Sequence, residues 1–166
     1  MINNKIITDF TLHNNNGRSV LFKEATGNPQ CGYEGPTTMY TWRVDELAYE
    51  MKVPKLEGLY VFPDATGFLF IEEEKRSDNL LLLDVYGKEK ARLSIPLYLV
   101  FGTSAANYAE YPSGFIGVTA PWENQKTKEK GKFAVLAWVE NGGGYYAFEL
   151  DWHTGRFLWG HRLEHY

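Results

Sequence analysis

Three histidines near the C-terminus carry the side chain that most often binds transition metals, so their spacing decides whether a metal site is expected. His161 and His165 are four residues apart, which on a helix would turn both imidazoles toward one ion. His153 lies upstream of them. Residues 156–163, however, have the pattern of a strand, in which four residues extend over about 13 Å, too far for one ion. We therefore expect no metal centre.

Cys31 is the single cysteine of the chain and its most nucleophilic side chain. It lies in a Gly- and Pro-rich loop, and no sequence signature of a cysteine hydrolase surrounds it. Ser113 lacks the Gly-x-Ser-x-Gly context of an activated serine. Gly142-Gly143-Gly144 lacks the Lys-Ser/Thr of a phosphate-binding loop. We expect no cofactor, a dispensable Cys31 and a non-enzymatic protein. A hydrolase that uses Cys31 or a carboxylate pair remains an alternative.

A cluster of carboxylates follows one apolar strand pattern. It consists of Glu72, Glu73 and Glu74, with Asp78 four residues on. Paired carboxylates can hydrolyse glycosides, but adjacent residues at a strand end point to opposite faces or to water. The chain has 17 basic and 21 acidic residues, a formal charge of −4. All of this net charge falls on residues 1–83. The cluster is therefore predicted to dock a basic protein partner, and nucleic acid is not expected.

Aromatic residues supply 16% of the chain. Several fall in or beside expected turns, where full burial is difficult: Trp122, Tyr145, Tyr146, Trp152 and Tyr166. Exposed Tyr and Trp are frequent anchors of protein interfaces, and we predict this role for Tyr146 and Trp152. The same rings can stack on sugars, so a small-ligand or carbohydrate-binding β domain is the first alternative.

The pattern of apolar residues predicts an α+β, β-rich fold in a single domain, 1–166. Tyr40, Val44, Leu47, Ala48 and Met51 recur at helical spacing, which predicts one main helix over about residues 38–52, ended before Pro54. This helix is expected to pack on a twisted antiparallel sheet or meander. A short helix is expected over 103–110. The expected strands are 6–13, 19–23, 59–62, 68–73, 79–85, 91–95, 97–101, 115–119, 133–140, 145–151 and 156–163.

One turn near the C-terminus is similar to a blade of the quinoprotein-type β-propellers. The residues that carry this resemblance are Asp151, Thr154, Gly155 and Trp159. A propeller needs at least about four blades, and 166 residues cannot supply them. The turn also has a local explanation, because Asp151 can accept hydrogen bonds from the following amides and Gly155 can adopt positive φ. We therefore expect a local meander.

The bulk properties indicate the environment and the class of protein. A single cysteine excludes an internal disulfide, residues 1–9 have no continuous apolar stretch, and no apolar run is long enough to cross a bilayer. We expect a cytoplasmic protein that does not enter membranes. Its acidic, single-domain, β-rich and motif-poor character resembles the small immunity proteins of bacterial toxin–immunity systems. That resemblance implies a protein that neutralises a cognate toxin by binding it; it assigns no site residues.

Overall fold

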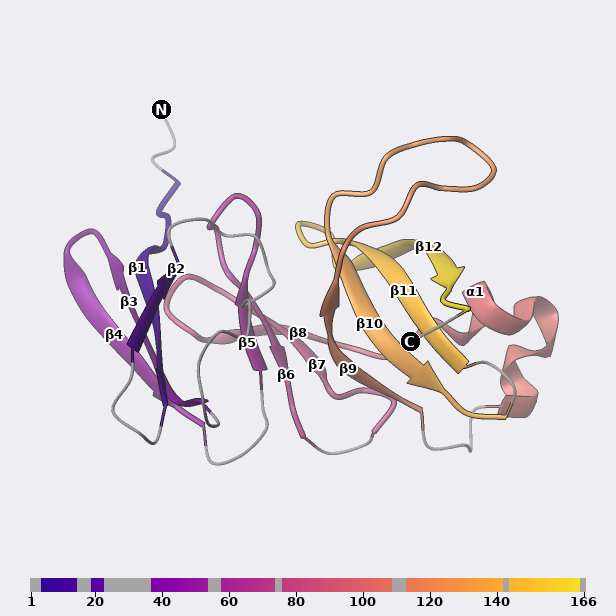
Figure 1. Ribbon diagram of the computed structural model, residues 1–166, viewed down its shortest axis with the longest axis horizontal. Coiled ribbons are helices and arrows are strands. Elements are labelled where there is room, and N and C mark those ends of the chain that lie inside the picture. The colour runs from indigo at the N-terminus through magenta and orange to yellow at the C-terminus, as the bar shows by residue number, and fades with distance from the viewer. Residues whose placement is uncertain are drawn as a thin grey trace. The chain divides into compact units, whose positions relative to one another are not determined.

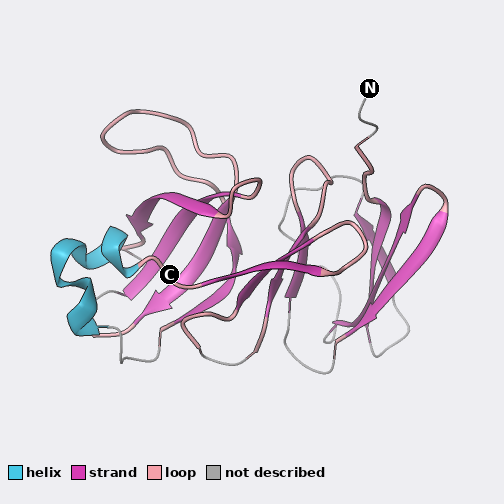
Figure 2. Ribbon diagram, turned by 180° about the vertical axis from the view of Figure 1, so that it is seen from behind, coloured by secondary structure: helices cyan, strands magenta, loops and turns pink. Residues whose placement is uncertain are grey.

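A computed structural model describes residues 4–14, 19–22, 37–53, 58–73, 76–108, 113–141 and 144–164. Strands make up most of this part of the chain, and its helical residues are confined to one segment between β8 and β9 (Figure 2). In chain order the elements are β1 Thr8–Asn14, β2 Ser19–Phe22, β3 Thr37–Val44, β4 Leu47–Lys52, β5 Gly58–Val61, β6 Phe68–Ile71, β7 Leu80–Leu83, β8 Glu89–Leu93, helix α1 Leu97–Phe101, the 3-10 helix Gly102–Tyr108, β9 Gly114–Thr119, β10 Ala134–Val139, β11 Gly144–Asp151 and β12 Arg156–Arg162.

The described strands form three four-stranded sheets rather than one (Figure 1). Their strand orders are β2-β1-β3-β4, β5-β6-β7-β8 and β12-β11-β10-β9. The chain divides into two compact units. Unit 1 comprises residues 1–73 and 81–91, and unit 2 comprises residues 74–80 and 92–166. The β-rich character predicted from the sequence is confirmed.

The predicted helix over residues 38–52 is wrong, because this segment is the β3–β4 hairpin. Tyr40, Trp42 and Val44 alternate as buried residues along β3, whereas a helix would have turned Trp42 away from the other two. Leu47, expected in the buried helical stripe, is 64% exposed. Asp45 and the next residue, Glu46, both adopt positive φ, which is the type I′ geometry that joins two strands with the correct twist.

Helical structure occurs instead where the sequence suggested a strand followed by a short helix. Residues Leu97–Phe101 are α-helical, and the 3-10 helix continues from them to Tyr108. Phe101 and Tyr108 stack with ring centroids 3.8 Å apart, which holds the two helical pieces together. None of the helices in the described chain is long and apolar enough to span a membrane.

The core of unit 1 lies between its two sheets. Phe10 stacks on Tyr40 in the first sheet, and the Trp42 ring contacts Phe68 of the second sheet edge-on, with centroids 4.8 Å apart. The Trp42 indole also donates a hydrogen bond of 2.7 Å to the carbonyl of Val85. The buried residues of this core are Ile7, Phe10, Leu12, Tyr40, Trp42, Val44, Val53, Leu59, Val61, Phe68, Leu81, Leu83 and Val85.

The third sheet, in unit 2, has two different faces. Strand alternation and register place Phe115, Val135, Phe148 and Phe157 on one face. Phe157 stacks on Phe115 and contacts Phe148 edge-on, so this is the apolar packing face. The opposite face carries a different set of side chains, described next.

Candidate protein-interaction surface

The structure places the predicted acidic residues in different surroundings. Glu72 is half-buried and Glu73 is exposed, and both belong to unit 1. Asp78 belongs to unit 2, and Glu74 lies outside the described residues. A docking cluster built from all four therefore remains a prediction.

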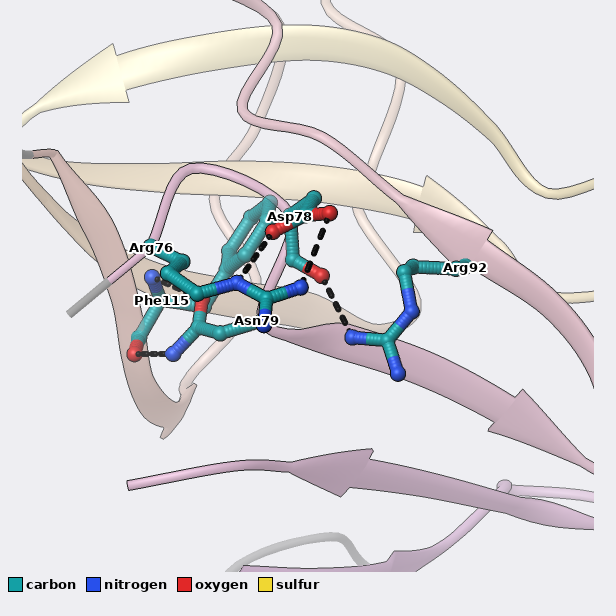
Figure 3. A network of polar contacts seen from close by, with 5 residues as sticks. All are labelled: Arg76, Asp78, Asn79, Arg92 and Phe115. Atoms are coloured by element: carbon teal, nitrogen blue, oxygen red, sulfur yellow. Dashed lines mark hydrogen bonds and ion pairs between the residues drawn. The ribbon is translucent and has the colours of Figure 1, made fainter. Parts of the chain in front are cut away.

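The charge of Asp78 is compensated within the protein. Its two carboxylate oxygens accept hydrogen bonds of 2.9 and 3.2 Å from the Arg76 guanidinium, and Arg92 donates to its backbone carbonyl at 3.0 Å (Figure 3). The Arg76 guanidinium keeps the pKa of Asp78 below its ordinary value. Asp78 is thus part of a local network, and any attraction for a basic partner depends on the glutamates.

Tyr146 and Trp152, the two predicted anchors, both contact the packing face of the third sheet. Tyr146 stacks on the fully buried Phe148, with centroids 5.5 Å apart. Trp152 contacts Phe133 edge-on at 5.8 Å. Both side chains are half-buried, so each contributes to packing as well as to the surface. Their role in partner binding stays a prediction.

The opposite face of this sheet carries a row of aromatic rings. Trp138 on β10 is paired with Tyr145 on β11, and their rings meet edge-on at 4.8 Å. His161 on β12 is opposite Ala147, and Trp159 is opposite Glu149. Since Tyr145, Ala147 and Glu149 alternate along β11, all of these positions share one face.

Trp122 reaches this face from the connection between β9 and β10. Its indole stacks on His161 with centroids 4.3 Å apart and an interplanar angle of 12°. Its carbonyl accepts a hydrogen bond of 3.2 Å from the Trp159 indole. The Trp122 side chain is nevertheless 41% exposed. We call the set Trp122, Trp138, Tyr145, Trp159 and His161 the aromatic face.

Glu149 holds the last residues of the β9–β10 connection, the segment that also carries Trp122. This buried carboxylate accepts backbone N–H hydrogen bonds from Lys132 and, at 2.9 Å, from Phe133. Its Oε2 atom is buried without a hydrogen-bond partner among the described residues. Burial raises the pKa of Glu149 above its ordinary value. These hydrogen bonds hold the β10 end of the connection, and the bond from the Trp159 indole to the Trp122 carbonyl holds the connection at Trp122, which positions this residue in advance of any binding event.

The chemistry of the aromatic face is that of recognition. The indole N–H groups of Trp138 and Trp159 already donate within the protein, to Glu140 and to the carbonyl of Trp122. The rings offer apolar surface, which desolvates at low cost and packs rigidly. Within the described ranges no three His, Cys, Asp or Glu side chains gather as a metal site.

The remaining candidate residues have other places. Ser113 is buried, and its hydroxyl accepts the backbone N–H of Glu140 at 3.0 Å, a structural role. Cys31, His165, Tyr166, Gly142 and Gly143 lie outside the described residues.

Among the aromatic-face residues, Trp122 and Tyr145 stood out in the sequence because they lie beside turns. Trp138, Trp159 and His161 were missed as partner-binding candidates. The sequence signal that could have found them is the two-residue period of a strand, which places side chains on one face. Trp159 and His161 are two residues apart on one strand, and Trp138 and Tyr145 are paired across the β10–β11 turn.

Comparison with known proteins yields one likeness of fold. No family model matches the chain, and no curated protein matches it. A chain of a solved structure described as "Structure of Tne2 in complex with Tni2" superposes with a TM-score of 0.65 at 12% identity. The match covers 96% of this chain and all of that one. At this identity the likeness shows the fold.

Proposed function

We propose that this chain is a non-enzymatic, cytoplasmic protein-binding module of the immunity type, which neutralises a cognate bacterial toxin by covering a surface of it. The observation that carries the proposal is the aromatic face, where three tryptophans, a tyrosine and a histidine line one side of a sheet. Trp and Tyr are the residues that most often dominate the energetics of protein interfaces. In addition, the chain with the same fold comes from a solved complex of two proteins.

Charge adds a preference for a basic partner. Unit 1 contains twelve acidic and eight basic residues, a formal charge of −4, while unit 2 contains nine of each. Opposite fields accelerate encounter, whereas buried aromatic contacts slow dissociation. The predicted docking glutamates, Glu72 and Glu73 of unit 1 and Glu74 at the start of unit 2, are assigned to steering. Replacing Glu73 by Lys should slow association and weaken its salt dependence, while dissociation is unchanged.

The test uses the product of the gene immediately upstream of this one. Expressed alone in a bacterial host, that product should arrest growth, and co-expression of this chain should restore growth through a complex that can be isolated. A non-toxic upstream product that forms no complex with this chain would refute the immunity function.

Two matched variants locate the contact. Trp122 and Leu158 are similarly exposed, 41% and 46%, and both belong to unit 2. Trp122→Ala should weaken binding at least about tenfold, mainly through faster dissociation, as loss of an interface anchor does. Leu158→Ala should bind like the parent. Equal affinities for the parent and Trp122→Ala would remove the aromatic face from the interface.

The second candidate function, carbohydrate binding, is favoured by one observation, the partly exposed Trp122 ring on which a sugar could stack. Sugar recognition also needs polar groups around the ring, and two indole donors of this face are already occupied. Binding to a glycan array that is lost in Trp122→Ala, without any protein partner, would support this candidate.

A further inference from the structure

Among the described strands, β4 is an edge strand with a partner on one side only. It is the last strand in the order β2-β1-β3-β4 and the outermost strand of its sheet in Figures 1 and 2. Its pairing with β3 runs from the pair Val44 and Leu47 beside the turn to the pair Met39 and Lys52, with no register shift. Natural edge strands are commonly protected by a bulge, a proline, a covering segment or charged side chains, and β4 carries two of the last, Glu50 and Lys52. Strand β4 has no bulge and no proline, and no described strand covers it.

The hairpin geometry determines which backbone groups of β4 are unpaired. In a two-residue hairpin the residues flanking the turn exchange both backbone hydrogen bonds, and bonded and non-bonded pairs then alternate. Val44 and Leu47 are the flanking pair. The N–H and C=O groups of Leu47, Tyr49 and Met51 therefore point to β3. Those of Ala48, Glu50 and Lys52 point away from the sheet.

The side chains of Leu47, Tyr49 and Met51 form an apolar row on one face of β4, and this row is only partly covered by the rest of unit 1. Tyr49 and Met51 are half-buried against the core of unit 1, and Leu47 is 64% exposed. Tyr86 lies next to Tyr49, with ring centroids 5.6 Å apart, and is itself 36% exposed. An added strand with apolar residues at alternate positions would cover Leu47 and Tyr49 while pairing with the free backbone groups.

Charge decides between the possible occupants. Unit 1 holds the whole formal charge of −4, and the free ladder is centred on the exposed carboxylate of Glu50. Symmetric pairing of two copies centred on Glu50 would set its carboxylate opposite the same residue of the other copy, and in any register two copies would bring together two units of formal charge −4, which is unfavourable. A basic strand is attracted by Glu50 and by the net charge of unit 1, and it meets one like charge in the free ladder, Lys52.

We propose that β4 is a docking edge that takes an extended segment of a partner protein, with alternating apolar and basic residues, as an additional antiparallel strand. This inference rests on the proposed protein-binding function and supplies a second contact surface for it. Main-chain hydrogen bonds to Ala48, Glu50 and Lys52 provide the affinity, and the apolar row provides the register.

The experiment uses the full chain and a synthetic peptide of alternating Lys and Val, flanked by Gly-Ser for solubility. Titration followed by backbone amide NMR should show exchange protection of the Ala48, Glu50 and Lys52 amides. A peptide of alternating Glu and Val should bind at least about tenfold more weakly because it meets Glu50 and the charge of unit 1.

The matched variants change one backbone donor. Ala48→Pro removes an outward N–H without touching a bond to β3 and should reduce binding of the basic peptide at least about tenfold; Ala48→Ser keeps the N–H and should bind like the parent. Should the proline variant fail to fold, Glu50→Lys provides the same test by reversing the preference between the two peptides.

Three results would overturn the proposal: no protection of the three amides, equal binding of both peptides, or a concentration-dependent dimer of the chain through β4. Growth protection against the upstream gene product is measured separately. Protection without peptide binding removes only this inference, and peptide binding without protection removes only the proposed immunity function.

Discussion

Replacement of Asn79 should be far more damaging than its small size suggests. Asn79 is 1% exposed, and its carboxamide pairs with the backbone of Phe115 at the edge of β9, as a neighbouring strand would (Figure 3). Its Nδ2 donates to the carbonyl of Phe115 at 2.9 Å, and its Oδ1 accepts the N–H of Phe115 at 2.9 Å. Strand β9 is the last strand of its sheet, so no neighbouring strand in that sheet is present on this side to replace these bonds.

The magnitude follows from the two groups left behind. Asn79→Ala removes both partners of a buried N–H and a buried C=O, and each unsatisfied buried group costs about 1–3 kcal/mol. The free energy of unfolding should therefore fall by about 2–5 kcal/mol. Arg76→Ala is the control, because it breaks the neighbouring but exposed ion pair to Asp78 and should leave stability nearly unchanged.

Urea unfolding followed by circular dichroism measures both variants, and the shift in midpoint at constant slope gives the change in stability. Hydrogen exchange at the Phe115 amide provides a local measurement, which should accelerate strongly in Asn79→Ala. If Asn79→Ala and Arg76→Ala unfold at the same urea concentration, the amide bridge does not stabilise β9 and the reasoning from buried hydrogen bonds fails.

Three further predictions concern stability. Since burial raises the pKa of Glu149, its contribution to stability is present below the unfolded-state pKa and is lost as pH rises toward the folded-state value. Glu149→Gln should therefore gain stability relative to the parent as the pH rises above the unfolded-state pKa, and an unchanged difference in urea midpoints would contradict this. Gly67→Ala should lower the melting temperature because its Cβ would overlap the carbonyl oxygen of Leu83, and a wild-type melting curve would disprove the contact. Met51→Ala should cost more stability than Glu50→Ala in chemical denaturation, because Met51 packs on the core and Glu50 faces water; equal losses would invalidate the register of β4.

Local chemistry made the last three strands predictable. Strands near 133–140, 145–151 and 156–163 were expected because apolar stretches alternate with turn residues, and the structure confirms them as β10, β11 and β12. The turn between the last two is also confirmed. The Asp151 carboxylate accepts the amides of His153 and Thr154, at 3.0 and 3.4 Å, and Gly155 has a φ of 71°. These interactions lie within residues 151–155, so the local sequence alone contains the information that predicts the turn.

The error over residues 38–52 shows where a local signal is ambiguous. Apolar residues at 40, 44, 47, 48 and 51 satisfy a helical period, but Tyr40, Trp42 and Val44 also satisfy the strand period of two. What decides is the packing of Trp42 on Phe68 and its hydrogen bond to Val85, 43 residues away. The turn at Asp45 and Glu46 lacks the Asn-Gly or Asp-Gly that would have indicated a hairpin.

The sequence by itself determined which residues the fold could use: abundant aromatic rings, an acidic first half, and no recognisable catalytic or metal-binding motif. Only the tertiary structure decided which rings act together. Tyr145 and Tyr146 are adjacent in sequence, yet one lies beside Trp138 on the aromatic face and the other stacks on Phe148 on the packing face. Successive side chains of a strand point to opposite faces, so membership of a site depends on register between strands, which is determined by contacts across the sheet.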